Sequence, residues 1–178
     1  MSPTVFNPLM LAALTVLLGG CGLTQTVADS TTSVAKAVFY KQINTLHLDV
    51  SSRVAMNTDE VDMNALSVPT LVRVYQLRDS RAIERASYDS LLNNDDSKLN
   101  SDLLDMRALL VKPGEGVQLS VPMDKDARFV AVVGLFRQPD IQADTWRLTL
   151  TRDDLDPDRA RLIELGDNRL TLRTLVKE

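Results

Sequence analysis

The stretch Arg-Phe-Val-Ala-Val-Val-Gly-Leu-Phe, residues 128–136, decides the fold class of this chain. Its apolar residues occupy both the even and the odd positions, so both faces of the strand that they predict must be covered. A central strand of a buried sheet meets that requirement. We therefore predict a core strand here and look for the strands that surround it.

Two strands and a long connection precede this core strand. Residues 70–77 (Thr-Leu-Val-Arg-Val-Tyr-Gln-Leu) are rich in β-branched and aromatic residues and follow Pro69, which is a natural entry to a strand. Earlier in the chain, Leu46, Leu48 and Val50 alternate with polar residues, which predicts a half-buried first strand. The connection between the two strands, residues 55–68, is unusually long for neighbouring strands.

The rest of the chain predicts one helical insert and five more strands. Residues 80–92 have helical periodicity, with Ser80 as a candidate N-cap, and a further helical turn is possible before Leu104. Strands are expected at 106–111 and 117–121, joined as a hairpin by the turn 112–116, and then at 146–151, 161–165 and 170–172. Eight strands with one helical insert between strands two and three predict a mainly β protein, a two-sheet β-sandwich.

The amino-terminal residues differ in kind from this domain. Residues 9–18 form an apolar run of about ten residues, where a membrane-spanning helix needs about 20. That length is typical of a secretory signal peptide, which we place at residues 1–20. No lysine or arginine precedes Lys36, so the positive n-region comes from the amino terminus alone or the true start lies elsewhere.

Cys21, the single cysteine, follows this run in the sequence Leu18-Gly19-Gly20-Cys21. An internal disulfide is excluded, and an exposed free thiol would be a liability in an oxidising compartment. The tetrapeptide resembles the lipobox of bacterial lipoproteins, in which the sulfur receives a diacylglyceryl group and the new amino terminus is acylated. Since Gly22 and not aspartate follows, the resemblance implies the outer membrane.

The segment between Cys21 and the domain is predicted to be a tether. Residues 22–33 are rich in threonine and serine with little apolar periodicity. Residues 34–43 are mildly apolar and fit either a short helix or an extended arm. The predicted division is thus a signal peptide at 1–20, a lipidated amino terminus and tether at 21–44, and a β-sandwich domain at 45–178.

Composition and motifs argue against nucleic-acid binding and against catalysis. The net charge is −4 with both signs spread along the chain, so no basic face would attract a polyanion. The single histidine, His47, is expected on the outward face of the first strand, where a solvated side chain is a better interpretation than a catalytic base. The run Asp154-Leu-Asp156-Pro-Asp158 begins like a calcium loop, but arginine stands where that loop needs glycine. Trp146 is expected to pack at a strand end of the core.

Taken together, the order of the motifs is similar to that of a known family. The lipobox, the long first loop, and the sequences Val-Arg-Val-Tyr-Gln-Leu-Arg-Asp (72–79), Leu-Val-Lys-Pro-Gly (110–114), Phe-Val-Ala-Val-Val (129–133) and Trp-Arg (146–147) together resemble the TssJ, or SciN, family. These are outer-membrane lipoproteins of the type VI secretion system. The resemblance covers nearly the whole chain after Cys21.

The resemblance implies a transthyretin-like sandwich on the periplasmic face of the outer membrane, within a TssJ-TssL-TssM membrane complex. It implies binding to the periplasmic C-terminal region of TssM through the loop between the first two strands. The residues that this assignment covers are Met56, Asn57, Thr58, Asp59, Glu60, Val61, Asp62, Met63 and Asn64.

Other interpretations stay open at this point. From its residues alone the loop is almost as consistent with an ordinary long surface loop as with a contact surface built of flexible methionines and acidic residues. A periplasmic carrier or chaperone for a small ligand or lipid is the alternative function, although aromatic residues make up only 4% of the chain. A hydrolase that uses His47 is the least favoured.

Overall fold

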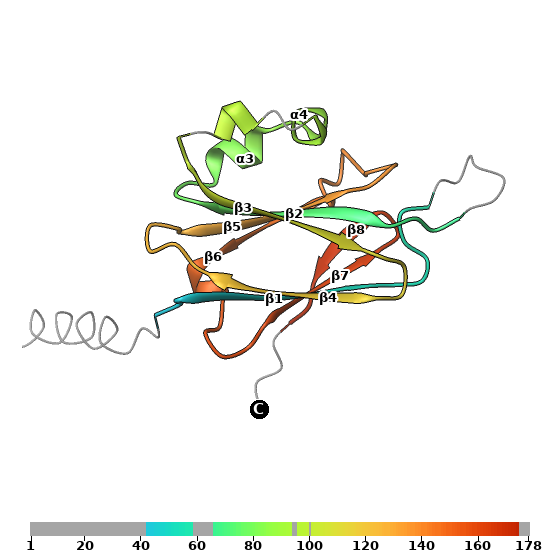
Figure 1. Ribbon diagram of the computed structural model, residues 1–178. Coiled ribbons are helices and arrows are strands. Elements are labelled where there is room, and N and C mark those ends of the chain that lie inside the picture. The colour runs from blue at the N-terminus through green and yellow to red at the C-terminus, as the bar shows by residue number, and fades with distance from the viewer. Residues whose placement is uncertain (1–41, 59–65, 94–95, 100, 175–178) are drawn as a thin grey trace, which may run out of the picture. The chain divides into compact units, whose positions relative to one another are not determined.

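The computed structural model describes residues 42–58, 66–93, 96–99 and 101–174 (Figure 1). The predicted signal peptide, Cys21, the tether and the segment 34–41 lie outside these residues. The described part contains eight strands, two short α-helices and two 3-10 turns. The strands are β1 (Thr45–Ser52), β2 (Thr70–Leu77), β3 (Leu103–Val111), β4 (Gly116–Pro122), β5 (Phe129–Leu135), β6 (Arg147–Thr151), β7 (Arg161–Gly166) and β8 (Arg169–Leu172). The helices are α3 (Arg81–Arg85) and α4 (Tyr88–Leu92), and the 3-10 turns are η1 (Asp96–Leu99) and η2 (Arg152–Asp154).

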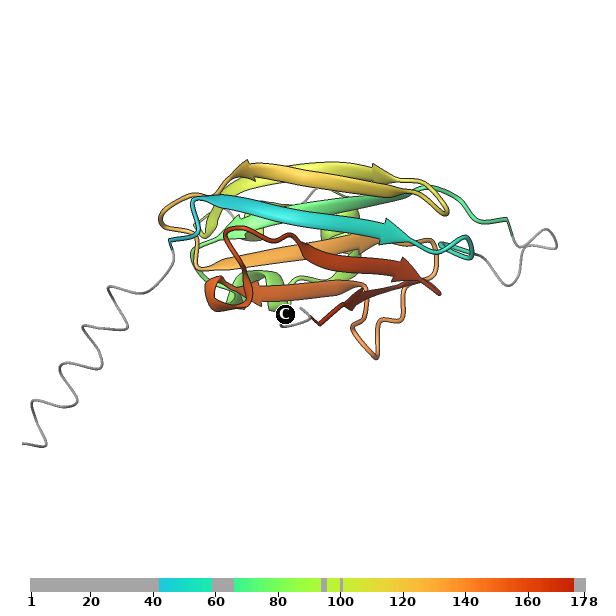
Figure 2. The ribbon, with the colours of Figure 1, turned by 90° about the horizontal axis from the view of Figure 1, so that it is seen from below.

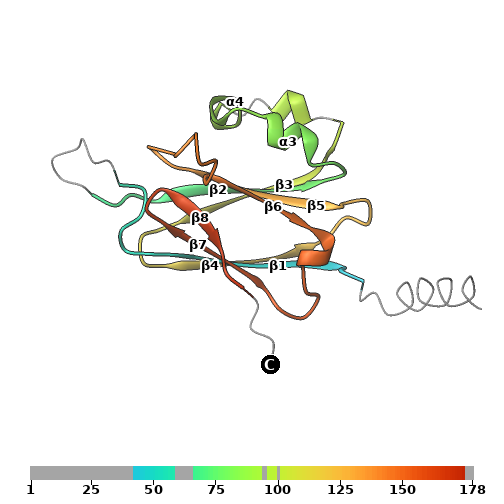
Figure 3. The same ribbon diagram turned by 180° about the vertical axis from the view of Figure 1, so that it is seen from behind.

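The strands form two four-stranded sheets that pack face to face (Figures 1 and 3). One sheet has the order β4-β1-β7-β8, and the other has the order β3-β2-β5-β6. All neighbours are antiparallel except β1 and β7, which run parallel. The predicted two-sheet sandwich is confirmed. None of the described helices is long and apolar enough to cross a membrane.

Strands β2 and β5 lie at the centre of their sheet and are buried along almost their whole length. One face of this sheet packs against the other sheet, and α3 and α4 lie over its opposite face (Figure 1). This double cover explains why residues 128–136 carry no polar face. We call the β3-β2-β5-β6 sheet the covered sheet and the β4-β1-β7-β8 sheet the open sheet.

Two arginines attach the helical insert to the covered sheet. Arg73 on β2 and Arg147 on β6 both stand opposite Val133 of β5, so all three side chains point to the face under the helices. The Arg73 guanidinium donates to the carbonyl of Leu91 in α4. The last carbonyls of a helix have no partner within it, and a guanidinium satisfies them.

In the open sheet, buried and partly exposed side chains alternate along β1. Leu46, Leu48 and Val50 of β1 are buried, while His47, Asp49 and Ser51 between them are partly exposed. This confirms the half-buried first strand. The predicted tight turn at residues 166–168 is also confirmed, because Gly166 pairs with Arg169 across a two-residue turn. Asp167 and Asn168 both have positive φ there, 50° and 58°, as the favoured hairpin turn requires.

The predicted hairpin between residues 106–111 and 117–121 is wrong. β3 pairs with β2 in the covered sheet, whereas β4 pairs with β1 in the open sheet. The turn 112–115 therefore carries the chain from one sheet to the other, with Gly114 at a φ of 74°. A turn signal between two alternating segments predicts a change of direction and does not say which sheet receives each strand.

The predicted helix at residues 80–92 is two helices separated by an extended step. Ala86 and Ser87 have extended backbones, and the Ser87 side chain accepts a hydrogen bond from the backbone N–H of Ser90, which starts α4. Ser80 precedes α3 but makes no side-chain capping bond. The neighbouring Asp79 accepts from the Arg81 N–H in its place, at 2.8 Å. Serine oxygens compete with backbone carbonyls for N–H groups, which explains the break.

Phe136 and Trp146 close the core at the ends of their strands. The Phe136 ring folds back over Gly134, where a Cβ atom would lie 2.6 Å from it. Glycine is therefore required at position 134 for this packing. Trp146 is buried immediately before β6 and meets Tyr88 edge to face, with ring centroids 5.1 Å apart. The prediction that Trp146 packs at a strand end is confirmed.

Candidate functional site

One end of the sandwich gathers four connections (Figures 1 and 2). They are residues 53–69 between β1 and β2, 112–115 between β3 and β4, 136–146 between β5 and β6, and 167–168 between β7 and β8. We call this the loop end. It contains the segment that the sequence assigns to partner binding, and of the β1–β2 connection the structure describes residues 53–58 and 66–69.

Asn57 holds the base of the β1–β2 connection. Its side chain is only 3% exposed, and its backbone has a φ of 51°, which asparagine tolerates better than most residues. The Oδ1 atom accepts a hydrogen bond of 2.6 Å from the backbone N–H of Arg137, and Nδ2 donates to the Pro69 carbonyl at 3.3 Å. One buried side chain thus joins the outgoing chain, the returning chain and the β5–β6 connection.

Further bonds fix the residues on either side of Asn57. The buried Met56 donates its backbone N–H to the Ser67 hydroxyl at 3.3 Å. Asn168, in the β7–β8 turn, donates its side-chain amide to the Thr58 carbonyl at 3.0 Å. The chain therefore leaves the sandwich after Thr58 from a defined position.

These contacts divide the predicted partner-binding residues into two groups. Met56, Asn57 and Thr58 form the base of the loop, and the first two have buried side chains. The other predicted contact residues lie outside the described residues: Asp59, Glu60, Val61, Asp62, Met63 and Asn64. Two large apolar side chains that flank the loop are exposed, Val54 by 76% and Leu66 by 63%. Their exposure was not part of the prediction, although both are apolar residues in a polar stretch of the sequence.

The β3–β4 turn packs against the start of the same connection. The Ser52 hydroxyl donates to the carbonyls of Lys112 and Glu115, at 2.7 and 3.1 Å, and Gly114 donates its N–H to the Arg53 carbonyl. The Arg53 side chain turns towards the open sheet, where its Nε donates to Glu164 at 2.5 Å. Arg53 and Arg173 together lower the pKa of the Glu164 carboxyl.

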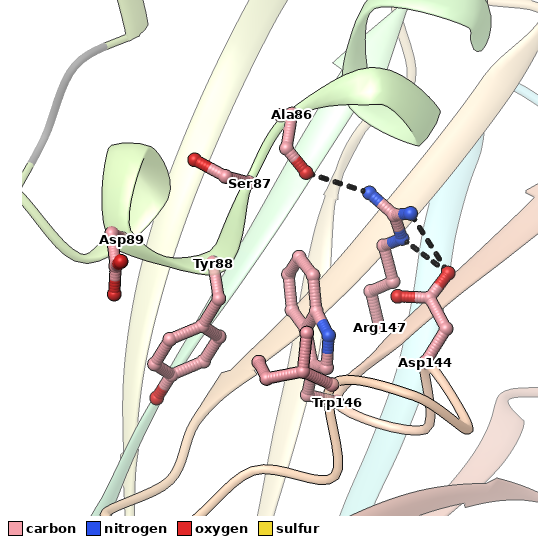
Figure 4. A pocket seen from close by; sticks show the side chains of 8 residues that line it. Ala86, Ser87, Tyr88, Asp89, Asp144, Trp146 and Arg147 are labelled. Carbon is pink, nitrogen blue, oxygen red and sulfur yellow. Dashed lines mark hydrogen bonds and ion pairs between the residues drawn. The ribbon is translucent and has the colours of Figure 1, made fainter.

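Two adjoining hollows lie between α4 and the β5–β6 connection, and Figure 4 shows the one that contains Trp146 and Arg147. One has a volume of about 420 Å³ and the other about 450 Å³. They share Tyr88, Asp89 and Ile141, so they form one groove, which we call the α4 groove. The first hollow is also lined by Asp144, Trp146 and Arg147, and the second by Leu92, Phe136, Arg137 and Pro139.

The floor of the α4 groove is held by hydrogen bonds. The Tyr88 hydroxyl donates to the Phe136 carbonyl. Burial of the ring, with a smaller contribution from the Asp89 carboxylate, raises the Tyr88 pKa to about 12. The Arg147 guanidinium lies 4.7 Å from the centre of the Trp146 ring and donates to the carbonyls of Ile83, Glu84 and Ala86, between 2.6 and 3.1 Å away. It also pairs with Asp144 at 2.8 Å, as Figure 4 shows.

The residues considered for chemistry have structural roles. His47 lies on the outer face of the open sheet, with Nδ1 3.1 Å from the Ser120 hydroxyl. In the aspartate run, Asp154 accepts two bonds from Thr151, and Asp156 accepts from the backbones of Asp158 and Arg159. Across the described ranges, no group of three or more histidine, cysteine or acidic residues is arranged to hold a metal ion.

Comparison with known proteins identifies the family. A family model described as "Type VI secretion lipoprotein, VasD, EvfM, TssJ, VC_A0113" matches residues 44–170, well over half of the chain. The chain belongs to this family. It is therefore a lipoprotein component of a type VI secretion system and not an enzyme, as the sequence motifs predicted. A comparison with curated protein sequences gives no match.

Solved structures agree with this assignment. A chain in a structure titled "Type VI membrane complex" is 39% identical, with a TM-score of 0.70, and the match covers 75% of this chain and 100% of that chain. A chain in the structure titled "T6SS protein TssM C-terminal domain (869-1107) from EAEC" is 37% identical, with a TM-score of 0.67 and the same coverage of both chains. Lip of Serratia marcescens, described as a membrane-bound component of the type VI secretion system, is 25% identical over 76% of this chain and 100% of its own, with a TM-score of 0.66.

Proposed function

We propose that this domain is held at the periplasmic face of the outer membrane by acyl chains on Cys21 and binds the periplasmic C-terminal region of TssM with its loop end. The observation that carries the proposal is the likeness, at 37% and 39% identity, to chains in structures whose titles name the TssM C-terminal domain and the type VI membrane complex. Both matches cover the full length of those chains.

The geometry of the loop end supports the assignment of the contact to the β1–β2 connection. Bonds through Met56, Asn57 and Thr58 fix the base of the loop before any partner arrives. A base that is already ordered lowers the entropy lost on binding. The residues beyond this base include three acidic ones, Asp59, Glu60 and Asp62, which would select a partner surface of opposite charge.

The anchoring part of the proposal depends on Cys21. A single acyl chain holds a protein only marginally at a membrane, whereas two or three chains hold it stably. Diacylglyceryl and N-acyl groups on Cys21 would supply that number. The core gives no support to the carrier alternative, since buried side chains from both sheets form one continuous cluster there.

Replacement of residues 59–64 by six glycines and serines tests the contact. This variant keeps Met56, Asn57 and Thr58, so the domain is expected to fold and to lose capture of the TssM periplasmic region. The matched control replaces residues 124–126, a turn at the opposite end, by Ser-Gly-Ser and should bind normally. Normal capture by the 59–64 variant, with an unchanged circular dichroism spectrum, would contradict the loop assignment.

Cys21→Ser tests the anchor. The variant should be recovered as a soluble periplasmic protein that keeps its affinity for the TssM region in solution but does not support secretion. Mass spectrometry of the wild-type mature protein should show the added acyl groups. Persistent recovery of Cys21→Ser with outer-membrane vesicles would count against the proposal.

A further inference from the structure

We infer that the α4 groove is a second docking subsite for the same partner, and that it receives an extended apolar segment with a basic residue beside it. This inference rests on the proposed function, because it adds a surface to the contact made by the β1–β2 loop. It is carried by the shape of the groove, its exposed apolar walls, an unpaired carboxylate and its position next to the loop base.

The walls of the groove expose apolar side chains that a binding segment would cover. Leu92 at the end of α4 is 47% exposed, and Ile141 on the β5–β6 connection is 57% exposed. They come from two different segments and line one hollow, which also contains Leu135 and Pro139. Large apolar side chains on the two walls of a hollow are a feature of surfaces that bind apolar groups of a partner.

The floor of the groove is formed before a partner binds, so few side chains of the groove would lose conformational freedom on binding. Tyr88 and Trp146 are buried, meet edge to face, and are held by the Tyr88–Phe136 bond and the Arg147 contacts. These contacts hold both rings in the positions at which the hollows are formed. A preformed hollow favours the entry of a side chain that fits it.

Charge indicates the polar part of the occupant. Within the part of the chain that the structure describes, the Asp89 carboxylate makes no ion pair and lines both hollows. Two cations also line the hollows, and neither forms an ion pair with Asp89: Arg147 binds three carbonyls and Asp144, and Arg137 lines the hollow next to Leu92. An exposed carboxylate beside an apolar hollow favours a segment in which a lysine or arginine adjoins apolar residues.

The position of the groove favours an occupant that belongs to the same partner. The N–H of Arg137, a lining residue, is the donor to Asn57 at the base of the β1–β2 loop. The mouth of the groove therefore adjoins the loop base through one hydrogen bond.

The test compares aspartate substitutions on the two faces of the sandwich. Leu92→Asp and Ile141→Asp are made in the lipidated full-length mature chain, and Leu162→Asp on the open sheet is the matched control. Leu162 is an exposed apolar residue of similar size, 38% exposed. The Kd for the purified TssM periplasmic region should rise by about tenfold or more for each groove variant and stay within about twofold for the control.

Two further measurements separate this inference from the proposed function. Asp89→Asn should weaken binding and reduce its dependence on salt, since the removed charge acts on a basic residue of the partner. If both groove variants bind like wild type while the 59–64 replacement abolishes capture, the groove is not a subsite and the proposed function stands. If Asp89→Asn changes nothing, the occupant has no basic residue there. If the wild-type chain does not bind the TssM region, both proposals fall.

Discussion

The covered sheet and the open sheet use similar strands in different surroundings. The central strands β2 and β5 of the covered sheet are buried on both faces, and their outer face meets the helical insert. The open sheet alternates, with Leu48 and Val50 inside and His47 and Asp49 outside. The difference shows how two five-residue helices can be stable in this insert. Helices this short are marginal on their own, and packing against the sheet stabilises them.

Arginines of the covered sheet provide much of that support. Arg73 binds a carbonyl of α4, and Arg147 binds three carbonyls at the end of α3 and just after it. The open sheet also uses arginines, but its Arg53 and Arg173 pair with Glu164 and remain about half exposed. Arg73 and Arg147 are thus structural links between the covered sheet and the helical insert, whereas Arg53 and Arg173 form surface ion pairs at the open sheet. The two arrangements should respond differently to substitution.

The largest difference is expected when an aspartate is introduced into each sheet, at a buried position in one and at an exposed position in the other. Ala131 is fully buried on β5, on the face under the helices, and Leu162 occupies the outer face of β7. Ala131→Asp should lower the free energy of unfolding by more than about 3 kcal/mol, because it buries an unpaired carboxylate. Leu162→Asp should change it by less than about 1 kcal/mol. Urea denaturation measures both, and equal losses would remove the distinction between the sheets.

A smaller loss is expected when the insert is detached from the sheet. Arg147→Ala removes the guanidinium donor from the carbonyls of Ile83, Glu84 and Ala86 and should cost about 2 kcal/mol. Arg147→Lys should recover only part of the lost free energy of unfolding, because one ammonium cannot form all the hydrogen bonds of the planar guanidinium. Hydrogen exchange in α3 should speed up more than exchange in β1. The control Arg107→Ala, which breaks an exposed pair with Asp105, should have little effect.

Removal of the Tyr88 hydroxyl should have a smaller effect that depends on pH. Tyr88→Phe loses the bond to the Phe136 carbonyl and should cost about 1 kcal/mol at neutral pH. The folded pKa of about 12 lies above the ordinary 10.0, so the folded state holds this proton more tightly. Its contribution is complete below pH 10 and is lost as the pH rises towards 12. Stability curves of wild type and variant should therefore converge in alkali.

The smallest effect is expected at the ion pairs of the open sheet, and it appears in acid. Hydrogen bonds from Arg53 and Arg173 lower the pKa of Glu164 below its ordinary 4.5, so the folded state binds fewer protons than the unfolded chain. Stability from this group is present above that value and is lost as the pH falls through the folded pKa. Glu164→Gln should flatten the acid limb of a stability profile between about pH 5 and pH 3. An unchanged acid limb would show that the pairs contribute nothing.

The comparison of the sheets also explains which predictions held. The pattern of residues 128–136 identified a strand covered on both faces, and the alternation at residues 46–51 identified a strand covered on one. These predictions succeeded because the side-chain period of a strand reports directly on its two faces. The hairpin at residues 106–121 failed because the same period carries no information about the neighbouring strand.

The candidate site was predicted less completely than the fold. The β1–β2 connection was found from its length and composition, but the burial of Asn57 depends on Arg137, 80 positions later in the chain. The α4 groove was not predicted, since its walls come from residues 88–92 and 135–141, which are joined only by folding. No local pattern in either segment indicates that the other lies across from it.

The sequence alone determined where strands form, which of their faces are buried and where the tight turn at Asp167 and Asn168 lies. Each of these follows from neighbouring residues, through side-chain period and backbone preference. Only the tertiary structure decided that β3 and β4 enter different sheets, that β1 runs parallel to β7, and that Asn57 is buried at the base of its loop. These features depend on contacts between distant segments, whose energies are set by packing across the whole domain.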